Sequence, residues 1–170
     1  MDSVLILNTF INVTSVEEVS ELLQKKEGKT IAVCNVNTLV RSYKNNVLQK
    51  KINSFDFRVA DGFPVAKSSD ILYKNKQKRV DGYNLFHKTI EKGLKQNLSH
   101  YFYGTDEKII KKLKLNLIKK YPNINIVGYS CPPILNYKEL TNPELVRDFI
   151  KKEPDILWVS LGFPKQEEFI

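Results

Sequence analysis

The sequence has little cysteine and no long apolar run. Its two cysteines, Cys34 and Cys131, lie far apart among 170 residues and lack the spacing of a metal site, which indicates a reducing compartment. No segment approaches the roughly 18 apolar residues of a membrane span. Met1 is followed by Asp2 and not by the basic segment that opens a secretory signal. These absences predict a cytoplasmic protein and leave peripheral attachment to the inner face of the cell membrane open.

Lysine is what the sequence has in excess. Its 27 Lys and Arg residues against 19 Asp and Glu residues give a formal net charge of +8. A basic protein suits anionic partners such as nucleic acid, an anionic membrane face or phosphorylated small molecules, although a solvated lysine-rich surface explains the balance equally well. The lysines are spread over several predicted helices without a nucleic-acid-binding motif, so we expect no nucleic-acid partner.

Apolar patterning predicts strands and helices in alternation. Ser15 and Glu18 have capping-box spacing at the start of a helix that Gly28 is expected to end. Strands are expected at Val4–Leu7, Ile11–Val13, Thr30–Cys34, Phe55–Ala60, Tyr101–Tyr103, Ile124–Val127 and Ile156–Leu161, and further helices at Asn37–Asn45, Pro64–Tyr73, Asn84–Lys95, Lys108–Lys119 and Pro143–Lys151. The alternation predicts one α/β domain, residues 1–170, with a mostly parallel sheet and helices on both faces.

Polar residues and glycines follow four of the predicted strands. Open α/β sheets bind ligands beyond the carboxyl ends of their strands, so these positions are candidate site residues. Each one alone is an ordinary turn residue, and four such strand ends together indicate a site. The residues are Asn35 and Asn37 after Cys34, Asp61 and Gly62 after Ala60, Gly104 and Thr105 after Tyr103, and Gly162 and Gln166 after Leu161.

Four stretches carry a more specific pattern. They are NVNTLV from Asn35, VADGFPV around Asp61, RVDGYNL from Arg79 and PDILWVSLGFPKQE from Pro154, with YFYGT and YPNINIVGY between them. In this order and spacing they resemble the WecG/TagA/CpsF glycosyltransferases, glycosyltransferase family 26. The resemblance covers essentially the whole chain and implies a modified Rossmann-like fold.

The resemblance also implies an activity. Members of this family transfer a sugar, here N-acetylmannosamine or a related hexose, from a UDP-sugar to an undecaprenyl-diphosphate-linked acceptor in the synthesis of cell-surface polysaccharides. They invert the anomeric carbon and need no metal or other cofactor, and this sequence has no Asp-x-Asp pair to hold a divalent cation against the diphosphate. The implied partners are the UDP-sugar, the polyprenyl-linked saccharide and, for a full-length member, the membrane surface. Homo-oligomerisation is left open.

Residue roles follow from the same resemblance. Asp61 matches the proposed general base, and the alternative is that it caps the helix whose first turn contains Pro64. Arg79 is the natural diphosphate partner, or else a surface arginine. Gln166 and Glu167 are substrate-binding residues, or else residues of a helix's first turn. The full set of expected substrate-binding residues is Asn35, Asn37, Arg79, Gly104, Gln166 and Glu167.

The sequence departs from the family pattern at several positions, among them Asp70, which stands where many members have a basic residue. Asn84 stands where many members have Asp, and Asn35 where members often have Thr, which leaves the sugar and the acceptor open.

The family also continues past the PKQE stretch with a strand, a glycine-rich turn and a basic amphipathic tail. We therefore expect the C-terminal part of the family fold to be missing from this chain. The rival to an active enzyme is an inactive relative that binds a nucleotide sugar or a partner.

Overall fold

The chain divides into two compact units of mixed strands and helices. The computed structural model describes residues 2–133, 139 and 142–170. The N-terminal unit comprises residues 1–89 and the C-terminal unit residues 90–170. The strand pairs β3–β4, β5–β6 and β5–β7 are parallel, and helices alternate with strands, so the predicted α/β class is confirmed. The described strands form three separate sheets where we expected one. The single domain over residues 1–170 stays a prediction.

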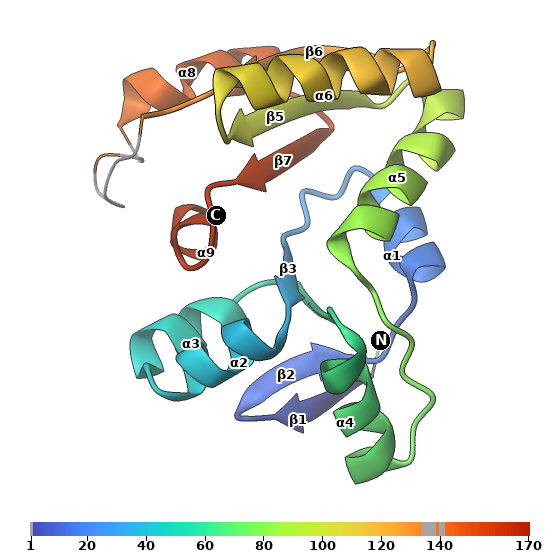
Figure 1. The fold of residues 1–170 in the computed structure, drawn as a ribbon, viewed down its shortest axis with the longest axis vertical. Helices are drawn as coiled ribbons and strands as arrows, with labels where there is room; N and C mark the ends of the chain where they lie inside the picture. Colours follow the sequence, from blue (N-terminus) through green and yellow to red (C-terminus); the bar gives the residue numbers. More distant parts are fainter. Residues whose placement is uncertain (1, 134–138, 140–141) are drawn as a thin grey trace. The chain divides into compact units, whose positions relative to one another are not determined.

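The N-terminal unit combines an antiparallel hairpin with a parallel strand pair (Figure 1). Cys34 at the end of β3 is aligned with Ala60 at the end of β4, so the residues that follow both strands leave the sheet at the same edge. The elements are β1 (Ser3–Ile6), β2 (Thr9–Asn12), α1 (Val16–Leu23), β3 (Ile31–Cys34), α2 (Val36–Tyr43), α3 (Asn46–Asn53), β4 (Phe57–Ala60) and α4 (Phe63–Tyr73), and α5 (Gly82–Gly93) begins in this unit.

Helix α1 shows how local sequence sets an element boundary. The Ser15 hydroxyl accepts from the Glu18 N–H at 3.3 Å, and the Glu18 carboxylate accepts from the Ser15 N–H at 2.8 Å, which confirms the capping box. The helix ends at Leu23, with Gln24 as its C-cap, so the expected end at Gly28 is wrong. The residues after Gln24 are Lys, Lys and Glu, and they offer no apolar side chain that would continue the buried face.

The core of the N-terminal unit lies between α1, the strand pair and the start of α5. Its buried cluster is Val19, Val59, Val80 and Leu85, against which Val16, Leu23, Ile31 and Val33 pack. Helices α2 and α3 pack against each other and against β2, and α4 packs against β1. The β3–β4 pair is therefore packed among other elements of the unit, which fix the position of its carboxyl edge.

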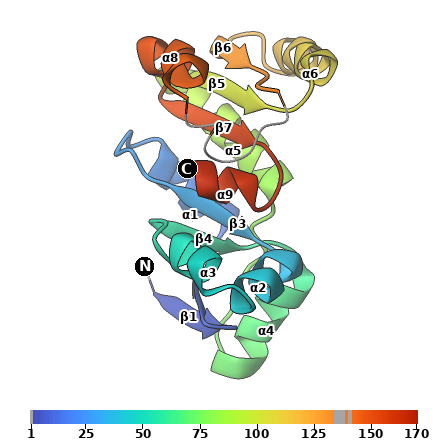
Figure 2. The same cartoon turned by 90° about the vertical axis from the view of Figure 1, so that its left-hand side faces the viewer.

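The C-terminal unit is a three-stranded parallel sheet in the order β6-β5-β7. Helices α6 and α8 lie on opposite sides of it (Figure 2), and the central strand β5 is buried from His100 to Gly104. None of the helices in the described residues combines the length and the apolar composition needed to cross a membrane. The elements are a 3-10 turn (Leu94–Gln96), β5 (Ser99–Gly104), α6 (Glu107–Lys120), β6 (Asn125–Ser130), α8 (Pro143–Lys152), β7 (Ile156–Ser160) and α9 (Lys165–Phe169).

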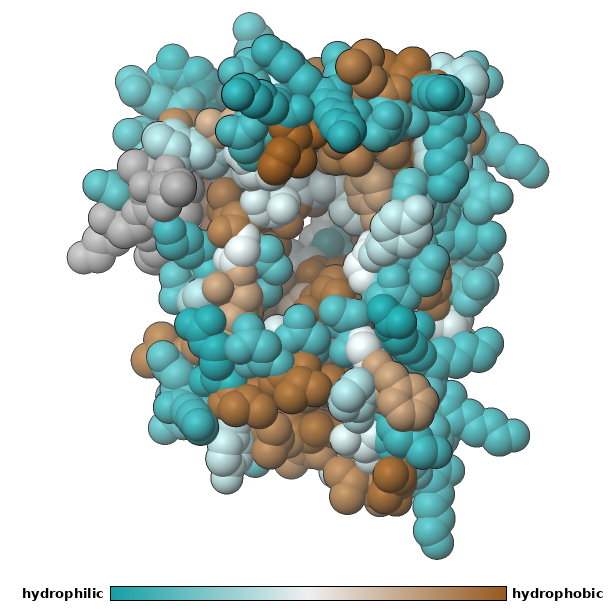
Figure 3. All heavy atoms as spheres, in the orientation of Figure 1, coloured by the Kyte–Doolittle hydropathy of each residue, from teal (hydrophilic) through white to brown (hydrophobic). Residues whose placement is uncertain are grey.

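The hydropathy of the surface differs between the elements of the two units. Hydrophilic side chains cover most of α6, in line with its lysines, whereas hydrophobic side chains gather over the β1–β2 hairpin (Figure 3). On α6 the buried residues are Ile110 and Leu117, whereas Ile109 is 59% exposed. Ile110 and Leu117 lie seven positions apart, which is close to two helical turns, so they share a helix face on which Ile109 does not lie.

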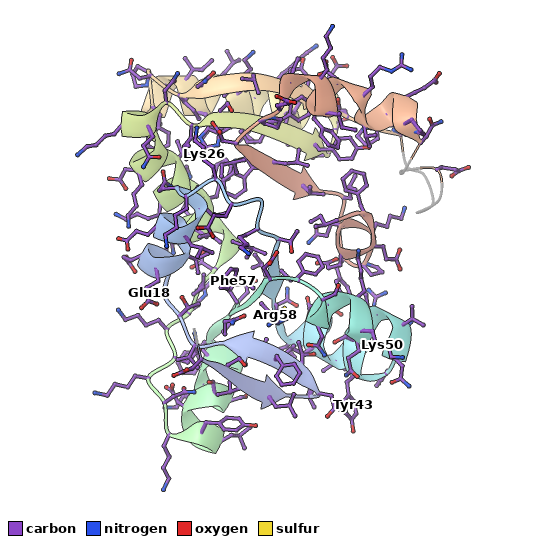
Figure 4. All side chains as sticks on the ribbon, turned by 180° about the vertical axis from the view of Figure 1, so that it is seen from behind. Glu18, Lys26, Tyr43, Lys50, Phe57 and Arg58 are labelled. Atoms are coloured by element: carbon purple, nitrogen blue, oxygen red, sulfur yellow. The ribbon has the colours of Figure 1, made fainter. Side chains whose placement is uncertain are left out.

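Arg58 on β4 is a buried cation that the sequence pattern did not predict. Its Nε donates to the Phe10 carbonyl oxygen at 2.6 Å, and one terminal nitrogen donates to the Asn53 carbonyl at 3.1 Å and to the Phe55 carbonyl. Its backbone N–H donates to Asn12 Oδ1 at 2.8 Å. Figure 4 shows the side chain on the part of β4 that faces the hairpin. Arg58 thus joins β4 to β2 and to the end of α3.

We expect Arg58→Met to lower the free energy of unfolding by about 2–4 kcal/mol, because buried carbonyl oxygens would lose a charged donor. Arg147 is exposed on α8, so Arg147→Met is the matched control and should change stability by about 0.5 kcal/mol or less. Urea denaturation of both variants measures the difference. Equal stability of the two variants would show that the Arg58 hydrogen bonds add nothing.

Candidate functional site

The predicted site residues fall into two groups, one in each unit. Asn35, Asn37, Asp61 and Arg79 belong to the N-terminal unit. Gly104, Gln166 and Glu167 belong to the C-terminal unit. The residues after β3, β4 and β7 and the glycine that ends β5 lie at the carboxyl ends of parallel strands, as the sequence predicted. Arg79 lies instead in the segment between α4 and α5.

Asp61 is the first residue after β4. Its N–H donates to the Cys34 carbonyl oxygen at 2.9 Å, which continues the β3–β4 pairing for one more step. The side chain is half-buried, and its carboxylate accepts from the Gly62 N–H. Gly62 occupies the N-cap position of α4, so the capping alternative for Asp61 is wrong. The Asp61 carboxylate therefore stands outside the helix.

Burial raises the pKa of the Asp61 carboxyl above its ordinary value. The Arg79 charge and the Gly62 hydrogen bond act in the opposite direction, while the negative charge of Asp81 adds to the increase. A carboxylate with a raised pKa is a stronger proton acceptor than an ordinary aspartate.

A backbone hydrogen bond brings the segment from Arg79 to Asp81 next to Asp61. The Val80 N–H donates to the Ala60 carbonyl oxygen at 2.8 Å, directly before Asp61. Arg79 Nε lies 3.8 Å from Asp81 Oδ2, and the Arg79 side chain is 57% exposed whereas that of Asp81 is 11% exposed. Arg79 can therefore reach a ligand, while Asp81 is held in the protein.

Asp81 is a site residue that we did not select from the sequence. Its two oxygens accept from the Asn84 N–H at 3.0 Å and from Asn84 Nδ2 at 2.8 Å. Burial alone would raise the pKa of Asp81, but the hydrogen bonds from Asn84 and the Arg79 charge bring it below the ordinary value. The signal that could have revealed Asp81 is an aspartate three residues before Asn84 at the start of a helical pattern, which is the position of a capping side chain.

Asn35 has a structural role in addition to its predicted one. Its Oδ1 accepts from the Thr38 N–H at 3.0 Å and from the Thr38 hydroxyl at 3.3 Å, so Asn35 is the N-cap of α2. Asn37 lies in the first turn of that helix, and both asparagines are exposed. The structure thus places Asn35 next to Asp61 at one sheet edge, and nucleotide binding by the two asparagines stays a prediction.

Gly104 ends β5 where the backbone of β7 passes very close. Its φ is +113°, and a Cβ at this position would lie 2.2 Å from the Ser160 carbonyl oxygen. The Thr105 N–H donates to the same oxygen at 3.0 Å. Glycine is therefore required here by strand packing, and substrate binding by Gly104 stays a prediction.

Gln166 and Glu167 lie in the short helix α9. Gln166 Nε2 donates to Glu167 Oε1 at 2.9 Å. Glu167 is 3% exposed, and its Oε2 is buried with no hydrogen-bond partner in the described part of the chain. Burial raises the pKa of Glu167, and the Gln166 hydrogen bond opposes this only in part. Their substrate-binding roles stay predictions.

Acidic, cysteine and histidine side chains are the usual protein ligands of metal ions. Among residues 2–133, 139 and 142–170, no three or more of these side chains are arranged to hold a metal ion. Metal independence of the reaction stays a prediction that an experiment must decide.

Comparison with known proteins matches residues 4–170 to the glycosyl transferase WecG/TagA/CpsF family. The chain is 28% identical over 148 residues to the N-acetylglucosaminyldiphosphoundecaprenol N-acetyl-beta-D-mannosaminyltransferases of Bacillus spizizenii and Bacillus subtilis, covering 87% of this chain and 56% of theirs. It is 24% identical over 157 residues to the protein of the same name from Staphylococcus aureus, covering 91% and 60%. The chain thus spans little more than half the length of these curated relatives.

Proposed function

This chain belongs to the WecG/TagA/CpsF glycosyltransferase family, and we propose that it takes part in sugar transfer from a UDP-sugar to an undecaprenyl-diphosphate-linked acceptor. The sugar is N-acetylmannosamine or a related hexose, as in the names of the relatives. The product would enter cell-surface polysaccharide synthesis. Because the acceptor is lipid-linked, the reaction would take place at the inner face of the cell membrane.

The observation that carries this proposal is the Asp61 carboxylate at the carboxyl end of β4, half-buried and outside the helix that follows. In an inverting transfer the acceptor hydroxyl oxygen attacks the anomeric carbon, and its proton passes to an Asp61 oxygen. The bond from the anomeric carbon to the UDP oxygen breaks, and its electron pair leaves with UDP. Asp61 must be ionised for this step, so activity should fall as pH drops through its raised pKa.

The departing diphosphate needs positive charge. Arg79 is the candidate because its guanidinium is exposed, its charge acts on Asp61, and it can donate two parallel hydrogen bonds to phosphate oxygens. The N-terminus of α4 starts two residues after Asp61 without a side-chain cap, so its free N–H groups would favour an anion as well. Together they would stabilise the leaving group without a divalent cation.

We expect UDP to bind residues 1–170 with the same dissociation constant in magnesium and in EDTA, because the charge that holds the diphosphate comes from the protein. Isothermal titration calorimetry under both conditions measures it. Arg79→Gln should weaken binding about tenfold, the effect of losing one charge-assisted hydrogen bond. The exposed Arg147 offers the control, and Arg147→Gln should leave affinity unchanged. Loss of UDP binding in EDTA would refute the metal-free account.

A further inference from the structure

Asp81 is fixed in position by burial, by hydrogen bonds to its carboxylate and by the adjacent backbone. It is 8% exposed, both of its oxygens are bound by Asn84, and the adjacent Val80 N–H is tied to Ala60. A carboxylate with two fixed oxygens in a fixed backbone cannot move toward or away from a ligand. Its fixed charge can still act on nearby charged groups, among them Arg79 and Asp61.

Arg79 lies within the influence of two carboxylates. Its Nε is 3.8 Å from Asp81 Oδ2, and its charge also acts on Asp61. The Arg79 side chain is 57% exposed and is long enough to pair with either the Asp81 or the Asp61 carboxylate. If Asp81 were neutral, Asp61 would be the carboxylate left to attract the guanidinium. A base paired with arginine is a poor proton acceptor because the pair favours its charged form.

We propose that Asp81 is a positioning residue of this site, whose fixed carboxylate holds the Arg79 guanidinium and so keeps Asp61 free to accept a proton. This inference rests on the proposed role of Asp61 as the base. It assigns Arg79 a resting position next to Asp81, from which the exposed guanidinium can turn to a diphosphate. Asn84 contributes by fixing both Asp81 oxygens.

The electrostatics around Asp61 agree with this arrangement. After burial, the charges that act on its pKa are Arg79, which lowers it, and Asp81, which raises it. The neighbouring end of β3 contributes the neutral Asn35, and the start of α4 contributes Gly62, Phe63 and Pro64, none of which is charged. Removing the Asp81 charge should lower the Asp61 pKa directly, and transfer of Arg79 to Asp61 should lower it further.

The test is a carbon-13 NMR titration of the Asp61 side-chain carboxyl in residues 1–170. We expect the Asp61 pKa to fall in Asp81→Asn, a variant that keeps the helix cap because asparagine caps about as well as aspartate. Asp56→Asn is the matched control. Asp56 directly precedes β4 and Asp61 directly follows it, so about 16 Å of strand separates them, beyond the screening length of about 8–10 Å. The control should leave the Asp61 titration unchanged.

An unchanged Asp61 titration in Asp81→Asn, or an equal shift in Asp56→Asn, would overturn the proposal. Asp81→Ser is a second variant without the charge but with a capping side chain, should the first fail to fold. The double variant Asp81→Asn with Arg79→Gln separates the two routes. The single variant Arg79→Gln is measured beside it. If Arg79 is transferred to Asp61, removing Arg79 should raise the Asp61 pKa more in the Asp81→Asn protein than in the wild type, and an equal rise in the two would reject the positioning role.

This titration needs no turnover, so its outcome is independent of the proposed function. If Asp61 is the base, the acidic limb of the pH–rate profile should move to lower pH in Asp81→Asn in parallel with the NMR titration. A shifted titration with an unmoved pH–rate limb would reject Asp61 as the base while the electrostatic coupling stands. An unshifted titration with normal wild-type turnover would reject the role of Asp81 alone.

Discussion

Asp61→Asn is expected to slow sugar transfer by about a hundred- to ten-thousand-fold, the usual contribution of a general base. Asparagine has the shape of aspartate and can still accept the Gly62 hydrogen bond, but it cannot take the proton of the acceptor hydroxyl. UDP affinity should change little, because the proposed base would face the acceptor and not the nucleotide. Turnover on a lipid-diphosphate acceptor and UDP calorimetry on the same preparations measure the two effects.

The folded state should tolerate this substitution. Because the folded-state pKa of Asp61 lies above its unfolded value, protonated Asp61 favours folding at low pH, and that contribution is lost as pH rises through the folded-state pKa. At neutral pH the charge opposes folding, so Asp61→Asn should leave the melting temperature equal or higher. A melting temperature that falls together with UDP affinity would indicate a structural role instead.

Asp56→Asn provides a control of opposite sign. Asp56 accepts from the Thr30 N–H and hydroxyl, both at 2.9 Å, and these bonds lower its pKa. Its contribution to stability is present above the unfolded pKa and lost as pH falls through the folded one. Asp56→Asn should therefore lower the melting temperature at neutral pH and leave turnover unchanged.

Near-normal turnover in Asp61→Asn would eliminate the base assignment. A wild-type protein that binds UDP without turnover would favour the inactive relative.

Gly104→Ala is expected to destabilise the C-terminal unit by about 3 kcal/mol. A non-glycine residue at positive φ costs about 1–2 kcal/mol, and forcing atoms into a packed site costs about 1–3 kcal/mol more. The clash is with the Ser160 carbonyl oxygen at 2.2 Å, a backbone atom that cannot rotate away. Strands β5 and β7 would have to separate at their carboxyl ends. The melting temperature should drop by roughly 10 °C for a protein of this size.

Gly162→Ala separates the clash from the backbone strain. Gly162 also has a positive φ, +77°, but a Cβ at this position would have no atom within 4 Å among the described residues. This variant should lose only the backbone contribution of about 1–2 kcal/mol. Thermal unfolding of the two variants side by side measures the difference. If Gly104→Ala melts no lower than Gly162→Ala, the close approach of β7 does not determine the choice of glycine.

Helix α3 was not predicted from the apolar pattern, although the sequence contains local signals for it. We expected one helix over Asn37–Asn45, whereas the chain forms α2 and then α3. Asn45 begins the second helix, since its Oδ1 accepts from the Val47 and Leu48 N–H groups at 3.0 and 3.1 Å. Leu48 and Ile52, four residues apart, form its buried face. Both signals are local, so the second helix was predictable in principle.

The sequence by itself determined the α/β class, most element positions, the family and the candidate residues at the strand ends. These follow from local periodicity, from capping groups such as Ser15 and Glu18, and from motifs that need no partner. Only the tertiary structure decided that the strands divide among separate sheets, that Arg58 is buried against the hairpin, and that the segment from Arg79 to Asp81 lies next to Asp61. Those facts depend on which strands pair and which backbone groups meet. Local sequence does not specify such contacts, because they join residues such as Phe10 and Arg58, or Ala60 and Val80, that lie far apart along the chain.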